Sequence, residues 1–252
     1  MHLFFGLNND LFYSNIIIPK FSFKDSFFNE CILCKINIVD QSWKISLLDD
    51  IENDKNFFYL KENKVKNNDI FFLATKKQIE LFDKNKINDL GSFTSQKNYR
   101  ASFSIFYRKS NGFSSYQSEY PFKMTKARGS VVTSTALVTN YGCKNYLLLK
   151  NIIDAPINKN FNAYIVNYKT KKIIDTFQLK TNCSNFLELT DKHIQPENYL
   201  ITDKYLCIPI YISEKDGHIS MEHTNPLTSN LLSEDRVELT KKFKNKIYEI
   251  IN

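Results

Sequence analysis

The residues best suited to chemistry lie in one polar stretch, residues 112–140. Within it, residues 114–120 carry hydroxyls, an amide, a carboxylate and two phenols, with no aliphatic side chain between them. Such side chains offer many hydrogen-bond donors and acceptors, and their aromatic rings can stack on a sugar. The pattern predicts a loop that binds a polar ligand. The expected ligand-binding residues are Tyr116, Gln117, Glu119, Tyr120 and Arg128.

Each of these residues has an expected role. Tyr116 and Tyr120 would stack on the face of a sugar. Gln117 and Glu119 would hydrogen-bond its hydroxyls, and Arg128 would meet a carboxylate or phosphate. The favoured function is therefore a binding or accessory protein for a polar, including an anionic, ligand of the carbohydrate or glycan-precursor class. The alternative is a surface connection whose hydroxyls only cap turns.

A second cluster, residues 220–224, suggests catalysis. His223 falls on the apolar face of an expected strand with Ile219 and Met221, and a buried histidine needs a polar partner. It could act as a general base for a loop serine, which makes a serine-type hydrolase or acyl-transfer enzyme the alternative function. A core histidine bonded to backbone explains the same residue, and the G-x-S-x-G motif is absent. The candidate catalytic residues are Ser115, Ser118, His223 and Glu222, with Glu119 as an alternative carboxylate.

Neither metal nor cofactor binding is indicated. His218 and Glu222 would lie about 13 Å apart along a strand, too far for one ion. Cys31 and Cys34 form a single C-x-x-C pair whose thiols would point to opposite faces of a strand. The sequence contains no P-loop, dinucleotide fingerprint or H-E-x-x-H motif. We therefore expect no cofactor and no metal.

The composition of the chain limits its expected binding partners and its expected cellular compartment. The chain has 252 residues, a net charge of +7 and 5 cysteines. Its lysines are scattered, which is typical of a solvated surface. Lys123, Lys126 and Arg128 flank aromatic residues and could contact nucleic acid, but three charges are few and would serve an acidic sugar equally well. The expected partner is therefore a polar small molecule or glycan rather than nucleic acid. An odd number of cysteines, with neither a signal peptide nor a transmembrane stretch, predicts a cytoplasmic protein.

The elements that must position these residues are mostly strands. Residues 31–39 and 41–48 alternate as a hairpin with a turn at Asp40-Gln41, and Asp216-Gly217 predicts another turn. Residues 131–138 have small or β-branched side chains on both faces, which favours a central strand. Pro209 indicates an edge or a bulge in its strand. The expected fold is mainly β, an antiparallel β-sandwich of immunoglobulin or jelly-roll type.

Two helices complete the expected fold. Thr75 would cap a short mid-chain helix that runs through Asp83, and Ser233 would cap a C-terminal α-helix. Phe243 and Ile247 belong to the apolar stripe of this last helix, which could pack on the sheet or join two copies as a homo-oligomer. A structural or subunit-interface protein is therefore a further alternative. We expect residues 1–252 to form a single globular unit, with a subdivision into residues 1–98 and 99–252 as the other arrangement.

Overall fold

The computed structural model describes residues 2–20, 31–87, 101–117, 120–121, 125–126, 132–135, 139, 141–223 and 233–252. The protein is mainly β, and its strands form four antiparallel sheets, which we number I to IV. Sheet I contains, in spatial order, β10 (Tyr120–Pro121), β1 (His2–Phe5), β7 (Ile70–Ala74), β3 (Ile32–Val39) and β4 (Ser42–Leu47). Sheet II contains β5 (Glu52–Asn53), β6 (Phe57–Leu60), β2 (Phe12–Pro19), β8 (Ser102–Tyr107) and β9 (Phe113–Gln117).

The other two sheets come from the second half of the chain. Sheet III contains β15 (Cys183–Leu189), β12 (Lys144–Asn151), β17 (Ile208–Lys215) and β18 (His218–His223). Sheet IV contains β11 (Val132–Ser134), β16 (Asn198–Thr202), β13 (Asn160–Asn167) and β14 (Lys172–Lys180). The helices include the short 3₁₀ helix η2 (Glu62–Lys64) and the α-helices α1 (Lys76–Glu80) and α2 (Arg236–Ile251).

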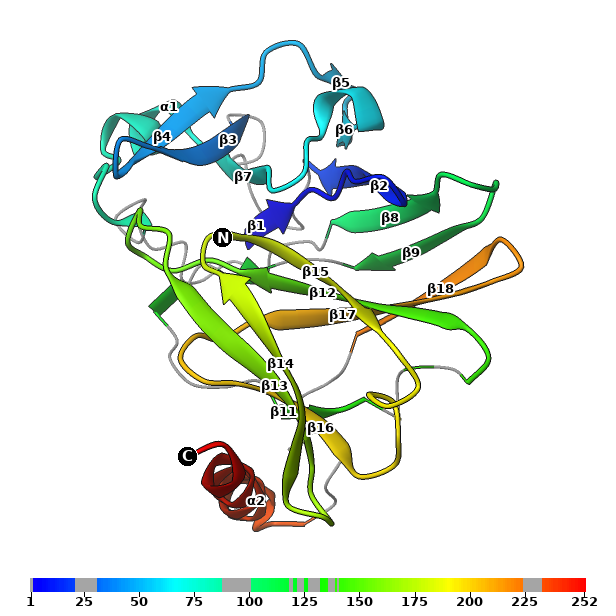
Figure 1. Cartoon of the computed structure of the whole chain (residues 1–252). Coiled ribbons are helices and arrows are strands. Elements are labelled where there is room, and N and C mark those ends of the chain that lie inside the picture. Colours follow the sequence, from blue (N-terminus) through cyan, green and yellow to red (C-terminus); the bar gives the residue numbers. More distant parts are fainter. Residues whose placement is uncertain are drawn as a thin grey trace.

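Sheet III is the middle layer of the molecule. Alternate residues of its strand β12 point to opposite faces, and both faces are apolar. Leu148 packs into a core shared with sheets I and II, whereas Leu147 and Leu149 pack against sheet IV. In Figure 1, sheets II, III and IV follow one another down the view, and α2 lies below sheet IV. This layering is compatible with the predicted β-sandwich, while its immunoglobulin or jelly-roll type stays a prediction.

Both predicted α-helices are present. Thr75 caps α1 with a capping box, in which its hydroxyl accepts from the Gln78 amide and the Gln78 side chain accepts from the Thr75 amide. The helix ends at Glu80, earlier than the predicted Asp83. The C-terminal helix begins at Arg236, and its N-cap is Asp235, so the prediction that Ser233 caps it was wrong. Ser233 lies in the turn before the helix, where its carbonyl accepts from the Arg236 amide.

Helix α2 packs within its own chain. Phe243 and Ile247 lie in an apolar cluster with Tyr199 and Ile201 of sheet IV, and Ile247 is fully buried. The stripe predicted as a sheet or subunit contact is therefore occupied by the sheet of the same chain. Among the exposed apolar side chains of the described residues, α2 contributes Val237 and Leu239, which lie nearer its N-terminus.

The tight turns follow the sequence closely. Asp40 and Gln41 have φ values of 48° and 57°, the left-handed pair that suits a two-residue hairpin between β3 and β4. Asp216 and Gly217 also have positive φ values and form the corresponding two-residue turn between β17 and β18. Pro209 pairs with β12, but the pairing of β17 with β18 begins only at the next residue, Ile210. The missing N–H of Pro209 therefore costs no hydrogen bond between β17 and β18.

Two strand predictions need correction. The expected central strand at residues 131–138 is described only as the three-residue β11, which stands at the end of sheet IV and pairs with β16. The expected polar loop is partly sheet, because Phe113–Gln117 forms β9 and pairs along its length with β8. Propensity alone favours a loop for consecutive serines, but the turn before Phe113 brings the chain back along β8, and this pairing decides the structure.

Candidate functional site

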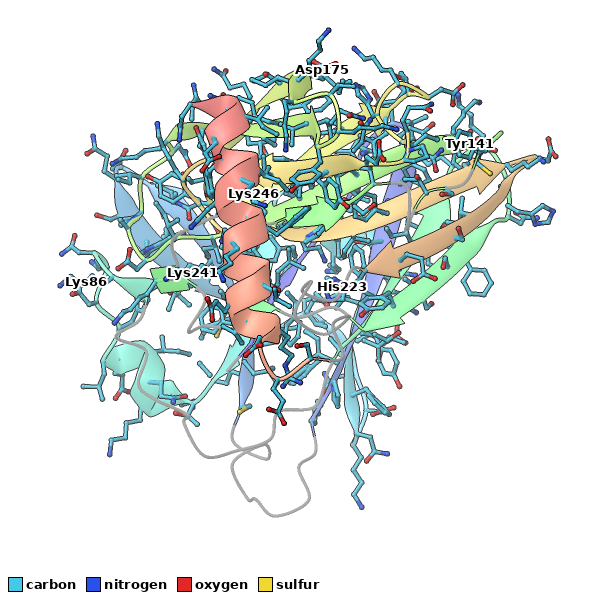
Figure 2. The ribbon with its side chains drawn as sticks, turned by 90° about the horizontal axis from the view of Figure 1, so that it is seen from below. Lys86, Tyr141, Asp175, His223, Lys241 and Lys246 are labelled. Atoms are coloured by element: carbon cyan, nitrogen blue, oxygen red, sulfur yellow. The ribbon has the colours of Figure 1, made fainter. Side chains whose placement is uncertain are left out.

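The strand β9 and the strand β18 meet between sheets II and III. The ring of Tyr116 lies edge-on to the imidazole of His223, with 5.3 Å between the ring centroids. Both residues are half-buried. Figure 2 shows His223 at the end of β18, close to the strands of sheet II. The structure therefore joins the two clusters that the sequence singled out, although they are far apart along the chain.

The orientation of His223 follows from its strand. Met221, two residues earlier, is buried in the core, and His223 pairs with Ile210 on the same face of sheet III. Its Nδ1 lies 3.3 Å from the carbonyl oxygen of Pro209. Because a carbonyl only accepts, Nδ1 carries a proton in this contact and donates it to the carbonyl oxygen. The predicted apolar face for His223 is thus confirmed.

Two of the predicted catalytic partners of His223, Ser115 and Glu222, lie away from its imidazole. The Ser115 hydroxyl is 2.6 Å from that of Ser104, on the outer face of sheet II, whereas Tyr116 points inward because neighbouring strand residues alternate. Glu222 is exposed on the face of β18 opposite to His223. The structure brings neither Ser115 nor Glu222 to the imidazole. Ser118 lies outside the described residues.

Other predicted ligand-binding residues are placed only in part. Gln117 pairs with Ser102 in sheet II, and Tyr120 pairs with Leu3 in sheet I, so both belong to strands rather than to a loop. Glu119 and Arg128 lie outside the described residues. Tyr116 is therefore the predicted ligand-binding residue whose side chain can be placed.

Sequence reasoning missed a lysine at the same interface. Lys150 of β12 is only 1% exposed, and its Nζ lies 3.8 Å from the centroid of the Phe103 ring. A cation over an aromatic face is stabilised by the ring quadrupole, the more so away from water. The sequence signal that could have identified Lys150 is its position as a single charged residue within the apolar run of residues 146–153, which predicts a buried strand.

Lys150, Phe103, Tyr116 and His223 form what we call the interlayer cluster. Phe103 and Tyr116 are direct cross-strand neighbours on β8 and β9, and both pack into the core between sheets II and III. On sheet III, Lys150 pairs with Ile208, while His223 pairs with Ile210 on the same strand. The cluster therefore combines an ammonium, an imidazole, a phenol and a phenyl ring between two layers.

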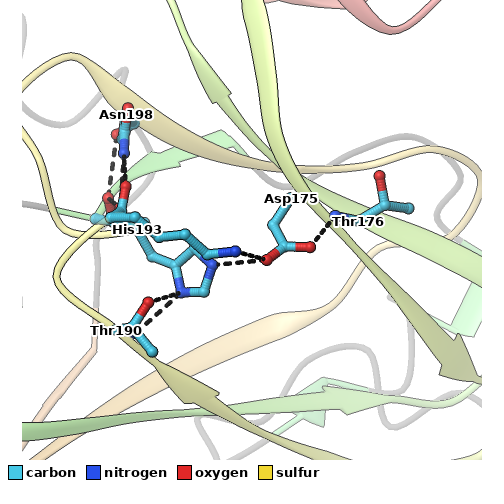
Figure 3. A network of polar contacts seen from close by, with 7 residues as sticks. Asp175, Thr176, Thr190, His193 and Asn198 are labelled. Carbon is cyan, nitrogen blue, oxygen red and sulfur yellow. Dashed lines mark hydrogen bonds and ion pairs between the residues drawn. The ribbon is translucent and has the colours of Figure 1, made fainter.

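A separate polar network surrounds Asp175 in sheet IV (Figure 3). Its Oδ2 is 2.6 Å from Lys192 Nζ and 2.9 Å from His193 Nε2. The hydrogen bonds from Lys192 and His193, together with the Thr176 amide, lower the pKa of Asp175 to about 2. The Thr190 amide donates to His193 Nδ1 at 3.0 Å, so Nε2–H donates to the carboxylate.

This network is structural. His193 is 3% exposed, and its carbonyl accepts from the hydroxyl of Thr135 and the side-chain amide of Asn198. Its Nδ1 is already occupied by a backbone N–H, which removes the basic nitrogen that catalysis would use. The arrangement ties the turn between β15 and β16 to β14.

The cysteine and metal predictions can be compared with the described residues. Cys31 packs beside the core between sheets I, II and III, while Cys34 lies in the core on the other side of sheet I, so the two face opposite ways as predicted. Burial raises the pKa of the Cys34 thiol to about 12. Within the described ranges, no group of three His, Cys, Asp or Glu side chains is placed to hold a metal ion.

Comparisons with known proteins add no relative. No family model, no curated protein and no solved structure matches the chain. None of the described helices is long and apolar enough to cross a membrane.

Proposed function

We propose that this chain is a binding or accessory protein for a polar ligand of the carbohydrate or glycan-precursor class, with its site at Tyr116 and His223. The observation that carries the proposal is the contact between their rings, 5.3 Å apart at the junction of two sheets. A half-buried tyrosine offers an apolar face to a sugar ring and a hydroxyl to its substituents. The imidazole adds a polar group that both donates and accepts.

The rigidity of the surroundings supports this assignment. Tyr116 is held by the β8–β9 ladder, and His223 by the β17–β18 ladder and the Pro209 carbonyl. Side chains fixed on paired strands lose little further freedom when a ligand binds, which favours affinity.

Saturation-transfer NMR with a panel of neutral and acidic sugars tests the proposal. We expect binding to the native protein and at least a tenfold loss of affinity in Tyr116→Ala. The matched control is Phe113→Ala, which removes an exposed ring from the same strand on its outer face. If no sugar in the panel binds, or if both variants bind as the native protein does, the proposal is wrong.

The hydrolase or acyl-transfer alternative keeps one supporting observation. The Pro209 carbonyl accepts from His223 Nδ1 and fixes the orientation of the imidazole, as a general base requires. Ser118 is the remaining predicted nucleophile. Hydrolysis of p-nitrophenyl acetate that is abolished in both Ser118→Ala and His223→Gln would favour this alternative. If the native protein and both variants hydrolyse the ester only at the background rate, the hydrolase alternative is excluded.

A subunit-interface role is the third alternative, and the packing of α2 changes where its contact would lie. Phe243 and Ile247 are covered by sheet IV, so a second copy that contacts α2 would meet Val237 and Leu239 instead. A concentration-dependent dimer by analytical ultracentrifugation, lost in Val237→Glu, would support it. A monomer at every concentration would exclude it.

A further inference from the structure

We propose that α2 and the turn between β13 and β14 form a basic surface that binds the anionic lipid headgroups of a membrane. The contact is peripheral, because the apolar stripe of α2 already packs on sheet IV. The surface includes none of the residues of the interlayer cluster, so this inference is independent of the proposed function.

The net charge of the chain is concentrated in two short segments. Residues 169–172 and 236–246 contain eight basic side chains and one acidic one, so together they carry +7, the net charge of the whole chain. The acidic residue, Glu238, is paired with Lys242 at 2.8 Å. The basic residues are Lys169, Lys171, Lys172, Arg236, Lys241, Lys242, Lys244 and Lys246. The acids around the two segments are Glu234, Asp235 and Glu249 at the ends of α2, and Glu197 in the turn before β16.

The tertiary structure brings these two segments side by side. Lys171 Nζ lies 3.7 Å from the centroid of the Tyr168 ring, and the centroid of that ring lies 4.9 Å from that of Phe243 in α2. The lysines of the turn therefore stand beside the helix, although the two segments are distant in the sequence. In Figure 2, which looks at this end of the molecule, α2 lies across the front of the view with Lys241 and Lys246 on it.

The basic side chains of this surface face solvent. Residues 169–172 are exposed in their turn, and Lys241 and Lys246 are exposed on α2. Sheet IV covers the opposite side of the helix, where Ile247 is fully buried. A cluster of roughly four to eight basic residues is attracted by the negative surface potential of an anionic membrane. That potential extends about 8–10 Å at physiological salt, so lysines on two adjacent segments act together.

Exposed aliphatic side chains lie among these lysines. Val237 and Leu239 of α2 are 67% and 44% exposed, and Ile173 at the start of β14 is 43% exposed. Ile173 pairs with Val166, which packs with α2, so it lies on the same face of sheet IV as the helix. Aliphatic side chains in such a position insert at the boundary between headgroups and acyl chains, while the lysine ammonium groups stay with the phosphates.

The uncharged side chains favour lipid over the phosphates of a nucleic acid. Surfaces that bind single strands without sequence preference add aromatic rings on which the bases stack. Here the rings of Tyr168, Tyr199 and Phe243 pack on one another, and Lys171 covers Tyr168. The exposed apolar groups are the aliphatic side chains described above, which suit acyl chains rather than bases.

Vesicle flotation tests the inference with two kinds of vesicle, one of phosphatidylcholine alone and one in which about a third of the lipid is phosphatidylglycerol. We expect the native protein to bind the anionic vesicles at least tenfold more tightly, and this binding to weaken as salt is added. The double variant Lys241→Gln/Lys246→Gln should bind them at least tenfold less tightly than the native protein. Lys169→Gln/Lys172→Gln should show a similar loss, because the turn and the helix form one surface.

Two further variants separate the parts of the surface. The control Lys76→Gln/Lys77→Gln removes two exposed lysines from α1 and should bind as the native protein does. Val237→Ser keeps every charge and should weaken binding at least threefold, because it removes an aliphatic side chain that inserts among the lipids.

Each remaining outcome overturns the inference. Binding to neither kind of vesicle, or equal binding to both, excludes an anionic lipid surface as the partner. A loss in the α1 control as large as in the α2 variant, or undiminished binding in both the α2 and the turn variants, shows that this surface is not the one that binds. Tight binding of a labelled single-stranded oligonucleotide without vesicle binding would assign the surface to nucleic acid. The comparison of the two vesicles needs only the native protein, so it decides the question without any variant.

Discussion

Replacing Asp175 by asparagine should make the stability of this protein less dependent on acid. The side chain keeps its size, but the carboxylate that accepts from Lys192 and His193 loses its charge. In the folded chain the pKa of Asp175 is lowered from 3.8 to about 2, first by the Lys192 hydrogen bond and then by that of His193. The folded state therefore favours the ionised form.

The sign and size of the effect follow from this shift. Because the folded pKa lies below the unfolded one, the contribution of Asp175 is complete above about pH 4 and is lost as the pH falls toward 2. A shift of this size corresponds to at most ~2.5 kcal/mol. The side chain is 30% exposed, and solvent screening reduces the expected contribution to about 1 kcal/mol.

Urea unfolding followed by circular dichroism measures the contribution of Asp175 to the free energy of unfolding. At pH 7 we expect Asp175→Asn to be about 1 kcal/mol less stable than the native protein, with the difference shrinking between pH 4 and pH 2. Asp191→Asn, which changes an exposed carboxylate in the neighbouring turn, is the control and should behave as the native protein does. A difference that is absent at pH 7, or that stays constant down to pH 2, would refute the reasoning.

Two further predictions concern burial. Ile247→Ala should destabilise the protein by about 3 kcal/mol, because it opens a cavity between α2 and sheet IV. The control Val237→Ala, on the exposed side of α2, should change stability by less than about 0.5 kcal/mol. Equal urea midpoints for the two variants would contradict the packing of α2 on sheet IV. Cys34 should resist iodoacetamide at pH 8 until the chain unfolds, because its buried thiol has a pKa of about 12; rapid labelling of the native protein, measured by peptide mass spectrometry, would show that the site opens.

Much of the local structure could be predicted from the sequence. The left-handed pair Asp40-Gln41 marks the β3–β4 hairpin, and the spacing of Thr75 and Gln78 encodes the capping box of α1. The apolar stripe of α2 likewise predicts which side of the helix is covered. These features depend on residues within one or two turns of each other, so a single stretch of sequence contains the interactions that form them.

The candidate site required the tertiary structure. Tyr116 lies in a stretch with loop-like composition, and only the pairing of β9 with β8 turns it inward while Ser115 turns outward. The contact of Tyr116 with His223, and the burial of Lys150 over Phe103, join strands from different sheets. Alternation along a strand shows that its residues have two faces, but it does not show what covers each face. Such contacts depend on how distant strands stack, and the free energy of that packing belongs to the whole fold rather than to any segment of the sequence.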